Sequence, residues 1–124
     1  MNKNRPKFLA LRLIRLPLPG LVSILHRASG TLLFFALPVL LWLLQGSLRS
    51  AESFEIIAGY WHLPMVKLVL IALLWALLHH FLAGLRFLAI DIGVGVKLGS
   101  ARASSKWVLG LGLTLTAFCG VRLW

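Results

Sequence analysis

The sequence is dominated by three long apolar runs that contain no charged side chain. Between Arg27 and Arg49 lie 21 uncharged residues, and between Lys67 and Arg86 lie 18. A helix of about 20 residues, rising about 1.5 Å per residue, crosses the hydrocarbon core of a bilayer. The third run has 15 uncharged residues and needs its flanking residues to complete a span. We therefore predict an all-α integral membrane protein with three transmembrane helices, at about residues 22–48, 63–87 and 104–124.

The composition supports a membrane protein and argues against other classes. Hydrophobic residues make up 60% of the chain, charged residues 13%, and the mean hydropathy is +0.92, well above the usual range of soluble domains. The net charge of +10 would suggest nucleic acid in a soluble protein, but here the basic residues punctuate apolar runs and form no patch. We expect the lipid bilayer, and no nucleic acid, as a partner. The single cysteine, Cys119, provides no internal disulfide.

The amino-terminal segment differs from the spans. Residues 5–19 mix apolar side chains with four basic ones and end in two prolines, a pattern typical of a segment that lies along the lipid headgroups. We expect residues 1–20 to form this interfacial segment and the chain to enter the membrane at about Leu21. No repeat or linker follows, so we interpret residues 1–124 as a single membrane-anchor domain.

The basic residues also predict the orientation. Six of them precede the first uncharged run and four lie between the second uncharged run and the third, whereas the first loop holds only Arg49 and the far end only Arg122. The positive-inside rule therefore places the amino terminus and the second loop in the cytoplasm and the carboxyl terminus outside. Because the first apolar run is long enough to span, we expect no cleaved signal peptide.

Two polar clusters lie in or near the first two spans, where polar groups are costly and are usually kept for a function. Ser23, His26 and Arg27 have the spacing i, i+3, i+4 and so share one helix face. The second cluster, at the exit of the second span, consists of His79, His80, Arg86 and Asp91. Since the first helix runs outward and the second returns, both clusters end at the cytoplasmic side. We therefore expect them to form one site.

The residue types in these clusters suggest two kinds of chemistry. A neutral imidazole such as that of His80 is a good axial ligand for haem iron, and His26, Arg27 and Arg86 could pair with haem propionates. A quinone needs a hydroxyl or guanidinium donor aimed at a carbonyl oxygen that gains negative charge on reduction. Ser23 and Arg27 meet that requirement.

Simpler interpretations of the same residues remain open at this point. Ser23 could cap the first helix. Arg27 and Arg86 could be ordinary interfacial anchors. A single intramembrane histidine is often a hydrogen-bonding group between helices.

Two motifs give the chain a specific resemblance. The first is S-x-x-H-R-x-S-G, from Ser23 to Gly30, and the second is H-x-x-x-G-x-R, from His80 to Arg86, followed by D-x-G at Asp91. In this order and at these ends of the first two spans, they closely resemble the cytochrome b subunit of bacterial succinate dehydrogenase. The resemblance covers nearly the whole chain.

The resemblance implies roles for individual residues. His80 would be an axial ligand of haem b, with the second axial histidine supplied by a companion membrane subunit. Ser23 and Arg27 would line the ubiquinone site, and His26 would lie near the haem propionates. One position departs from the pattern, because Phe87 stands where the relatives have a second histidine after the arginine.

The resemblance also implies a complex in the bacterial inner membrane. This chain would anchor an iron–sulfur subunit and a flavoprotein subunit on the cytoplasmic face, and electrons would pass from succinate to ubiquinone. The sequence has no flavin-binding fingerprint and no cysteine set for iron–sulfur clusters, so succinate oxidation itself belongs to other subunits. The alternatives are the anchor of a fumarate reductase and a non-redox membrane assembly or transporter subunit.

Overall fold

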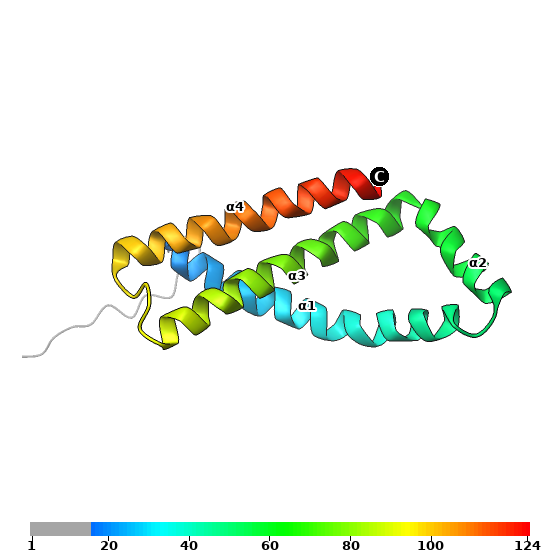
Figure 1. Cartoon of the computed structure of the whole chain (residues 1–124), viewed down its shortest axis with the longest axis horizontal. Helices are drawn as coiled ribbons and strands as arrows, with labels where there is room; N and C mark the ends of the chain where they lie inside the picture. The colour runs from blue at the N-terminus through cyan, green and yellow to red at the C-terminus, as the bar shows by residue number, and fades with distance from the viewer. Residues whose placement is uncertain (1–15) are drawn as a thin grey trace, which may run out of the picture.

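The computed structural model describes residues 16–124, which form three long helices and a short helical connection (Figure 1). The elements are α1 (Leu18–Ser47), α2 (Ala51–Gly59), a 3-10 turn η1 (Tyr60–His62), α3 (Pro64–Asp91) and α4 (Leu98–Leu123). Helices α1, α3 and α4 are each long and apolar enough to cross a membrane. The predicted all-α class with three spans is confirmed. Most of the predicted interfacial segment, residues 1–15, lies outside the described residues.

Helix α1 begins earlier than its sequence predicts, because its prolines start the helix and do not break it. Pro17 is the N-cap residue and Pro19 lies in the first turn, where a missing N–H costs nothing since such groups have no partner within the helix. The backbone N–H groups of Gly20 and Leu21 donate to the Pro17 carbonyl oxygen at 2.8 and 3.1 Å. The chain therefore becomes helical at Leu18.

The other two long helices also extend past the charge positions that marked the predicted spans. Helix α3 continues to Asp91, and α4 starts at Leu98, six residues before the predicted beginning of the third span. Charged residues end a membrane span without ending a helix, because a helix can continue beyond the hydrocarbon. The turn between these helices uses Gly93 and Gly95, whose φ angles of 84° and 77° suit glycine.

The connection between α1 and α3 contains a helix that the sequence analysis did not predict. Ser50 caps α2 and forms a reciprocal capping box with Ser53. The Ser53 N–H donates to Ser50 Oγ at 3.1 Å, and the Ser50 N–H donates to Ser53 Oγ at 3.0 Å. This short helix separates the end of α1 from the beginning of α3.

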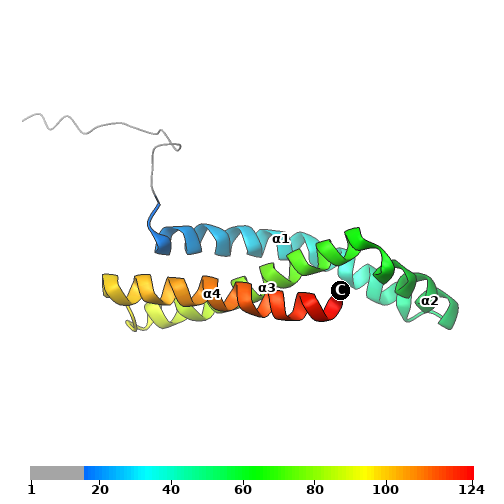
Figure 2. The ribbon, with the colours of Figure 1, turned by 90° about the horizontal axis from the view of Figure 1, so that it is seen from above.

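The three long helices meet most closely at the end where α1 begins and α3 ends. Helices α1 and α3 cross in Figure 1, and Figure 2 shows α4 alongside α3. The buried core consists of Val22 from α1, Ala83 from α3 and Val108 from α4. Both sequence motifs lie at this end, so the core positions them against each other.

Helix α4 packs on α3 through small residues. Its buried positions include Ser105, Gly112, Thr116 and Gly120, and small side chains allow close approach of membrane helices. Where α3 begins and α4 ends, Lys67 Nζ donates to the Trp124 carbonyl oxygen at 2.8 Å and lies 5.3 Å from the Trp124 ring centroid. The two helices are thus joined along their length.

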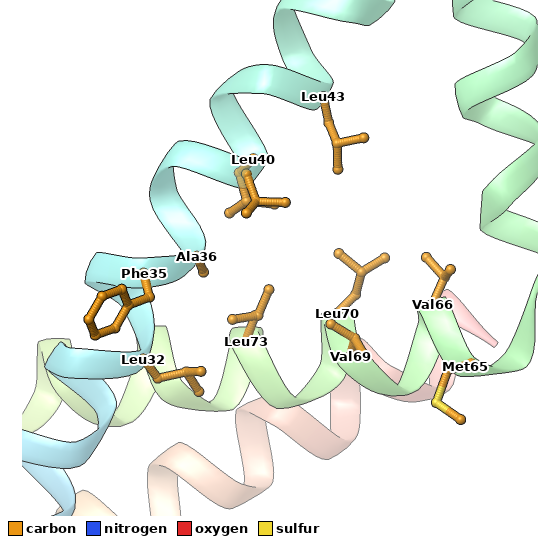
Figure 3. Close-up of a pocket in the computed structure, with 11 residues that line it drawn as sticks. Leu32, Phe35, Ala36, Leu40, Leu43, Met65, Val66, Val69, Leu70 and Leu73 are labelled. Atoms are coloured by element: carbon orange, nitrogen blue, oxygen red, sulfur yellow. The ribbon is translucent and has the colours of Figure 1, made fainter.

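Helices α1 and α3 diverge toward α2 and leave an apolar cleft of about 500 Å³ between them. Figure 3 shows side chains of both helices pointing into this space. Those from α1 include Leu40 and Leu43, and those from α3 include Val66, Leu70 and Leu73. Every residue that lines this cleft is apolar.

Candidate functional site

The two histidines of the sequence motifs lie against each other. The rings of His26 on α1 and His80 on α3 are stacked, with centroids 4.1 Å apart and an interplanar angle of 8°. One residue of each cluster, His26 and His80, therefore meets the other at the contact of α1 with α3.

The hydrogen bonding of His80 defines which ring nitrogen carries the proton. Its Nδ1 lies 3.0 Å from the His26 carbonyl oxygen and 3.4 Å from Ser29 Oγ. A carbonyl oxygen only accepts hydrogen bonds, so the closer contact requires a proton on Nδ1. In the neutral ring, Nε2 then carries the free lone pair. Histidines that ligate metals usually have this arrangement, with the other ring N–H donating to a carbonyl or carboxylate.

One glycine, Gly30, makes the close contact of His80 with α1 possible, and a second, Gly84, lies in ordinary contact with His26. A Cβ atom on Gly30 would lie 2.7 Å from His80 Cε1, a separation that real Cβ atoms do not show. A Cβ atom on Gly84 would lie 3.6 Å from His26 Nε2. Gly30 is therefore needed for the position of His80, and the space above Gly84 is occupied by the His26 ring.

Phe87, the position that departs from the family pattern, packs on the same histidine. Its ring centroid lies 5.2 Å from that of His26 at an angle of 59°. His26 thus has the His80 ring and the Phe87 ring as neighbours.

Ser23 and Arg27 lie on the more open face of α1. Ser23 is half-buried and Arg27 is exposed, and Arg27 Nε donates to the Ser23 carbonyl oxygen at 3.4 Å. Ser23 lies inside the helix, whose N-cap is Pro17, so it does not cap α1. Neither residue belongs to the buried core around Val22, Ala83 and Val108.

Arg86 turns toward α4. It is 8% exposed, its Nε donates to Ser104 Oγ at 2.9 Å, and its Nη2 donates to the Ala101 carbonyl oxygen at 3.2 Å. These bonds connect the end of α3 to the beginning of α4. Contact of Arg86 with a haem propionate stays a prediction.

His79 has a different environment from its neighbour His80. It is fully buried and stacks on Trp75, with centroids 5.3 Å apart. Neither ring nitrogen has a hydrogen-bond partner among residues 16–124. Its Cα lies 3.9 Å from where a Cβ on Gly112 would stand, so the backbone of α3 at His79 lies close to α4.

An apolar cleft of about 530 Å³ begins at Gly30 and Leu77, near the His80 ring, and continues between α1 and α3 as far as Leu40 and Leu70. Its walls are leucines and Phe34, which suit the apolar body of a large ligand. Within the described part of the chain, no group of three or more His, Cys, Asp or Glu side chains could hold a metal ion by itself. The proton on His80 Nδ1 leaves Nε2 of that ring as a candidate metal donor.

Ser29 is the site residue that the sequence analysis did not single out. It is 2% exposed, and its hydroxyl donates to the His26 carbonyl oxygen at 2.9 Å. Its position three residues after His26, on the same helix face, was the available signal.

Comparison with known proteins agrees with this arrangement. Residues 1–119 match the family model described as the succinate dehydrogenase/fumarate reductase transmembrane subunit. The chain belongs to this family. A succinate dehydrogenase cytochrome b556 subunit of Coxiella burnetii is 34% identical over the full length of both chains. The subunit of the same name from Paracoccus denitrificans is 33% identical over 83% of this chain and 79% of its own.

A third relative extends the same pattern within this family. The cytochrome b556 subunit of Rickettsia felis is 30% identical over 91% of this chain and 88% of its own. The resemblance that the two motifs indicated is therefore confirmed, and the chain is a membrane subunit of the succinate dehydrogenase class.

Proposed function

We propose that this chain is the membrane-anchor subunit of a succinate dehydrogenase, which binds haem b together with a partner membrane subunit and forms part of the ubiquinone-reduction site. The observation that carries the proposal is the bond from His80 Nδ1 to the His26 carbonyl oxygen at 3.0 Å, which leaves Nε2 free to bind iron. The relatives' name, cytochrome b556 subunit, supports a b-type haem.

The residues around His80 fit an axial ligand. The ring is held by the His26 carbonyl, by Ser29 and by the space above Gly30, and an apolar cleft opens next to it. A bound haem supplies one-electron transfer. We assign the second axial histidine to the partner membrane subunit, and we assign His26, Arg27 and Arg86 to the propionate side.

The quinone site is assigned to Ser23 and Arg27. A quinone carbonyl oxygen becomes more negative on reduction, and preorganised donors stabilise that charge. The Ser23 hydroxyl and the Arg27 guanidinium lie one turn apart on the less buried face of α1. The two donors can therefore approach one ligand from the same wall.

We place the amino terminus in the cytoplasm and the chain in the bacterial inner membrane. The exposed basic residues Lys97, Arg102 and Lys106 lie at the same end of the bundle as Arg27, which fits the positive-inside rule. An iron–sulfur subunit and a flavoprotein subunit would dock at this end. A fumarate reductase anchor is the second candidate, because the family description covers both enzymes.

Substitution of His80 tests the proposed function. In the purified membrane complex, His80→Ala should abolish the low-spin b-type haem spectrum or convert it to a high-spin one, because the iron loses an axial ligand. The control is His79→Ala, which should keep the spectrum. His79 is fully buried, so its loss disturbs packing at least as much. An unchanged low-spin spectrum in the His80 variant would rule out this residue as the ligand.

A further inference from the structure

We propose that Ser29 is a positioning residue for the haem ligand His80. Its hydroxyl shares the Nδ1 proton of His80 with the His26 carbonyl and thereby sets the orientation of the ring and the electron donation of Nε2. This inference rests on the proposed haem-binding function and assigns a role to a residue that contacts no haem.

The hydrogen bond that Ser29 donates sets the orientation of its hydroxyl. Oγ donates its hydrogen to the His26 carbonyl oxygen at 2.9 Å. The proton is thus directed away from His80, and the lone pairs of Oγ are available to Nδ1 at 3.4 Å. Since Nδ1 carries a proton, it has two acceptors, the carbonyl at 3.0 Å and the hydroxyl. The three groups close a triangle.

This triangle is buried, and the His80 ring is confined on several sides. Ser29 is 2% exposed, so water does not compete for its hydroxyl. The His26 ring covers one face of His80 at 4.1 Å, and Gly30 leaves no spare room beside Cε1. A second acceptor on Nδ1 therefore limits the remaining freedom of the ring, which is rotation about the bond to the carbonyl.

The contact of Ser29 with His80 differs from an ordinary hydrogen bond between a helical serine and its own helix backbone. Ser47 donates to the Leu44 carbonyl oxygen at 2.8 Å, in the same i to i−3 geometry and on the same helix. Ser47 is more exposed than Ser29 and is the last residue of α1. Such bonds are common for serine in helices. What distinguishes Ser29 is burial together with the contact to His80.

The Ser29 contact affects how strongly His80 Nε2 donates electrons to iron. An acceptor that draws on the Nδ1 proton makes Nε2 a stronger donor, and a stronger donor favours ferric over ferrous iron and lowers the reduction potential. Removal of the hydroxyl should therefore raise the haem potential. Loss of such a supporting residue typically costs about 10- to 100-fold in metal affinity. We expect the lower end of this range, about tenfold in haem retention, because the carbonyl remains.

The experiment compares Ser29→Ala, Ser29→Thr and Ser47→Ala in the purified complex. The readouts are the haem midpoint potential, the electron paramagnetic resonance g-values of the ferric haem, which report the orientation of the axial rings, and the haem content per subunit. We expect Ser29→Ala to raise the potential, shift the g-values and lower haem retention. Ser29→Thr, which keeps a hydroxyl, should stay near the parent, and Ser47→Ala should match it.

Two results would overturn the inference. One is a Ser29→Ala complex whose potential and g-values equal those of the parent. The other is an equal change in Ser29→Ala and Ser29→Thr, which would assign the effect to side-chain volume. Either result would leave His80 as the ligand. Failure of the proposed function itself would show separately, as an unchanged low-spin spectrum in His80→Ala.

Discussion

At the scale of single residues, Ser23 and Arg27 are the pair whose chemistry matters most for turnover. A preorganised donor to an oxygen that gains charge contributes about 2.7–4 kcal/mol, so its removal costs about 10² to 10³ in rate. We therefore expect Ser23→Ala and Arg27→Leu to lower succinate-to-quinone turnover by about this factor. The measurement is quinone reduction by the assembled complex.

The control for this prediction separates quinone binding from anchoring. Succinate oxidation with an artificial acceptor that takes electrons from the soluble subunits should survive in both variants. Arg102→Leu, which removes an exposed arginine at the same end of the bundle, should preserve both activities. Parallel loss of both activities in Arg27→Leu, with release of the soluble subunits, would instead assign this arginine to anchoring.

At the scale of helices, the Arg86 side chain connects α3 to α4. Its Nε donates to Ser104 Oγ at 2.9 Å, and Arg86 is 8% exposed, so loss of the hydroxyl leaves a buried charged donor without this partner. Hydrogen bonds to charged groups contribute about 1.5–3 kcal/mol. We expect Ser104→Ala to destabilise the assembled complex by about this amount, measured as a lower thermal midpoint.

Ser100→Ala is the matched control for the helix connection. Ser100 is also near the start of α4, but it is exposed and makes no hydrogen bond to Arg86 among the contacts of the described residues. Its substitution should leave the thermal midpoint unchanged. Equal midpoints for the two variants would show that the Arg86 bond does not stabilise the contact of α3 with α4.

At the scale of the whole molecule, three spans place the two chain ends on opposite sides of the membrane. The basic residues predict a cytoplasmic amino terminus. Reporter fusions after Ser53 and after Trp124 should therefore report the outer side, and a fusion after Gly99 should report the cytoplasm. Paired reporters, one active only outside and one only inside, make each result positive. A cytoplasmic reporter at Trp124 would show that α4 does not cross.

The sequence by itself determined the fold class and the family. Apolar runs of about 20 residues predict membrane helices because the bilayer core has no water to satisfy backbone polar groups. This is a local property, and it predicted α1, α3 and α4 correctly. Helix ends were less accurate, as at Leu98, because charge marks the membrane boundary and not the end of hydrogen bonding. The capped helix α2 was missed.

The tertiary structure decided which polar side chains face each other. His79 and His80 are adjacent in sequence, yet the ring nitrogens of His79 are buried without a hydrogen-bond partner among the described residues, and the His80 ring meets the His26 carbonyl on α1. Arg86 turns to Ser104, and Ser29 reaches His80. These partners depend on the rotation and crossing of the helices. Packing of residues far apart in the chain, such as Val22, Ala83 and Val108, sets that geometry, and no local pattern contains it.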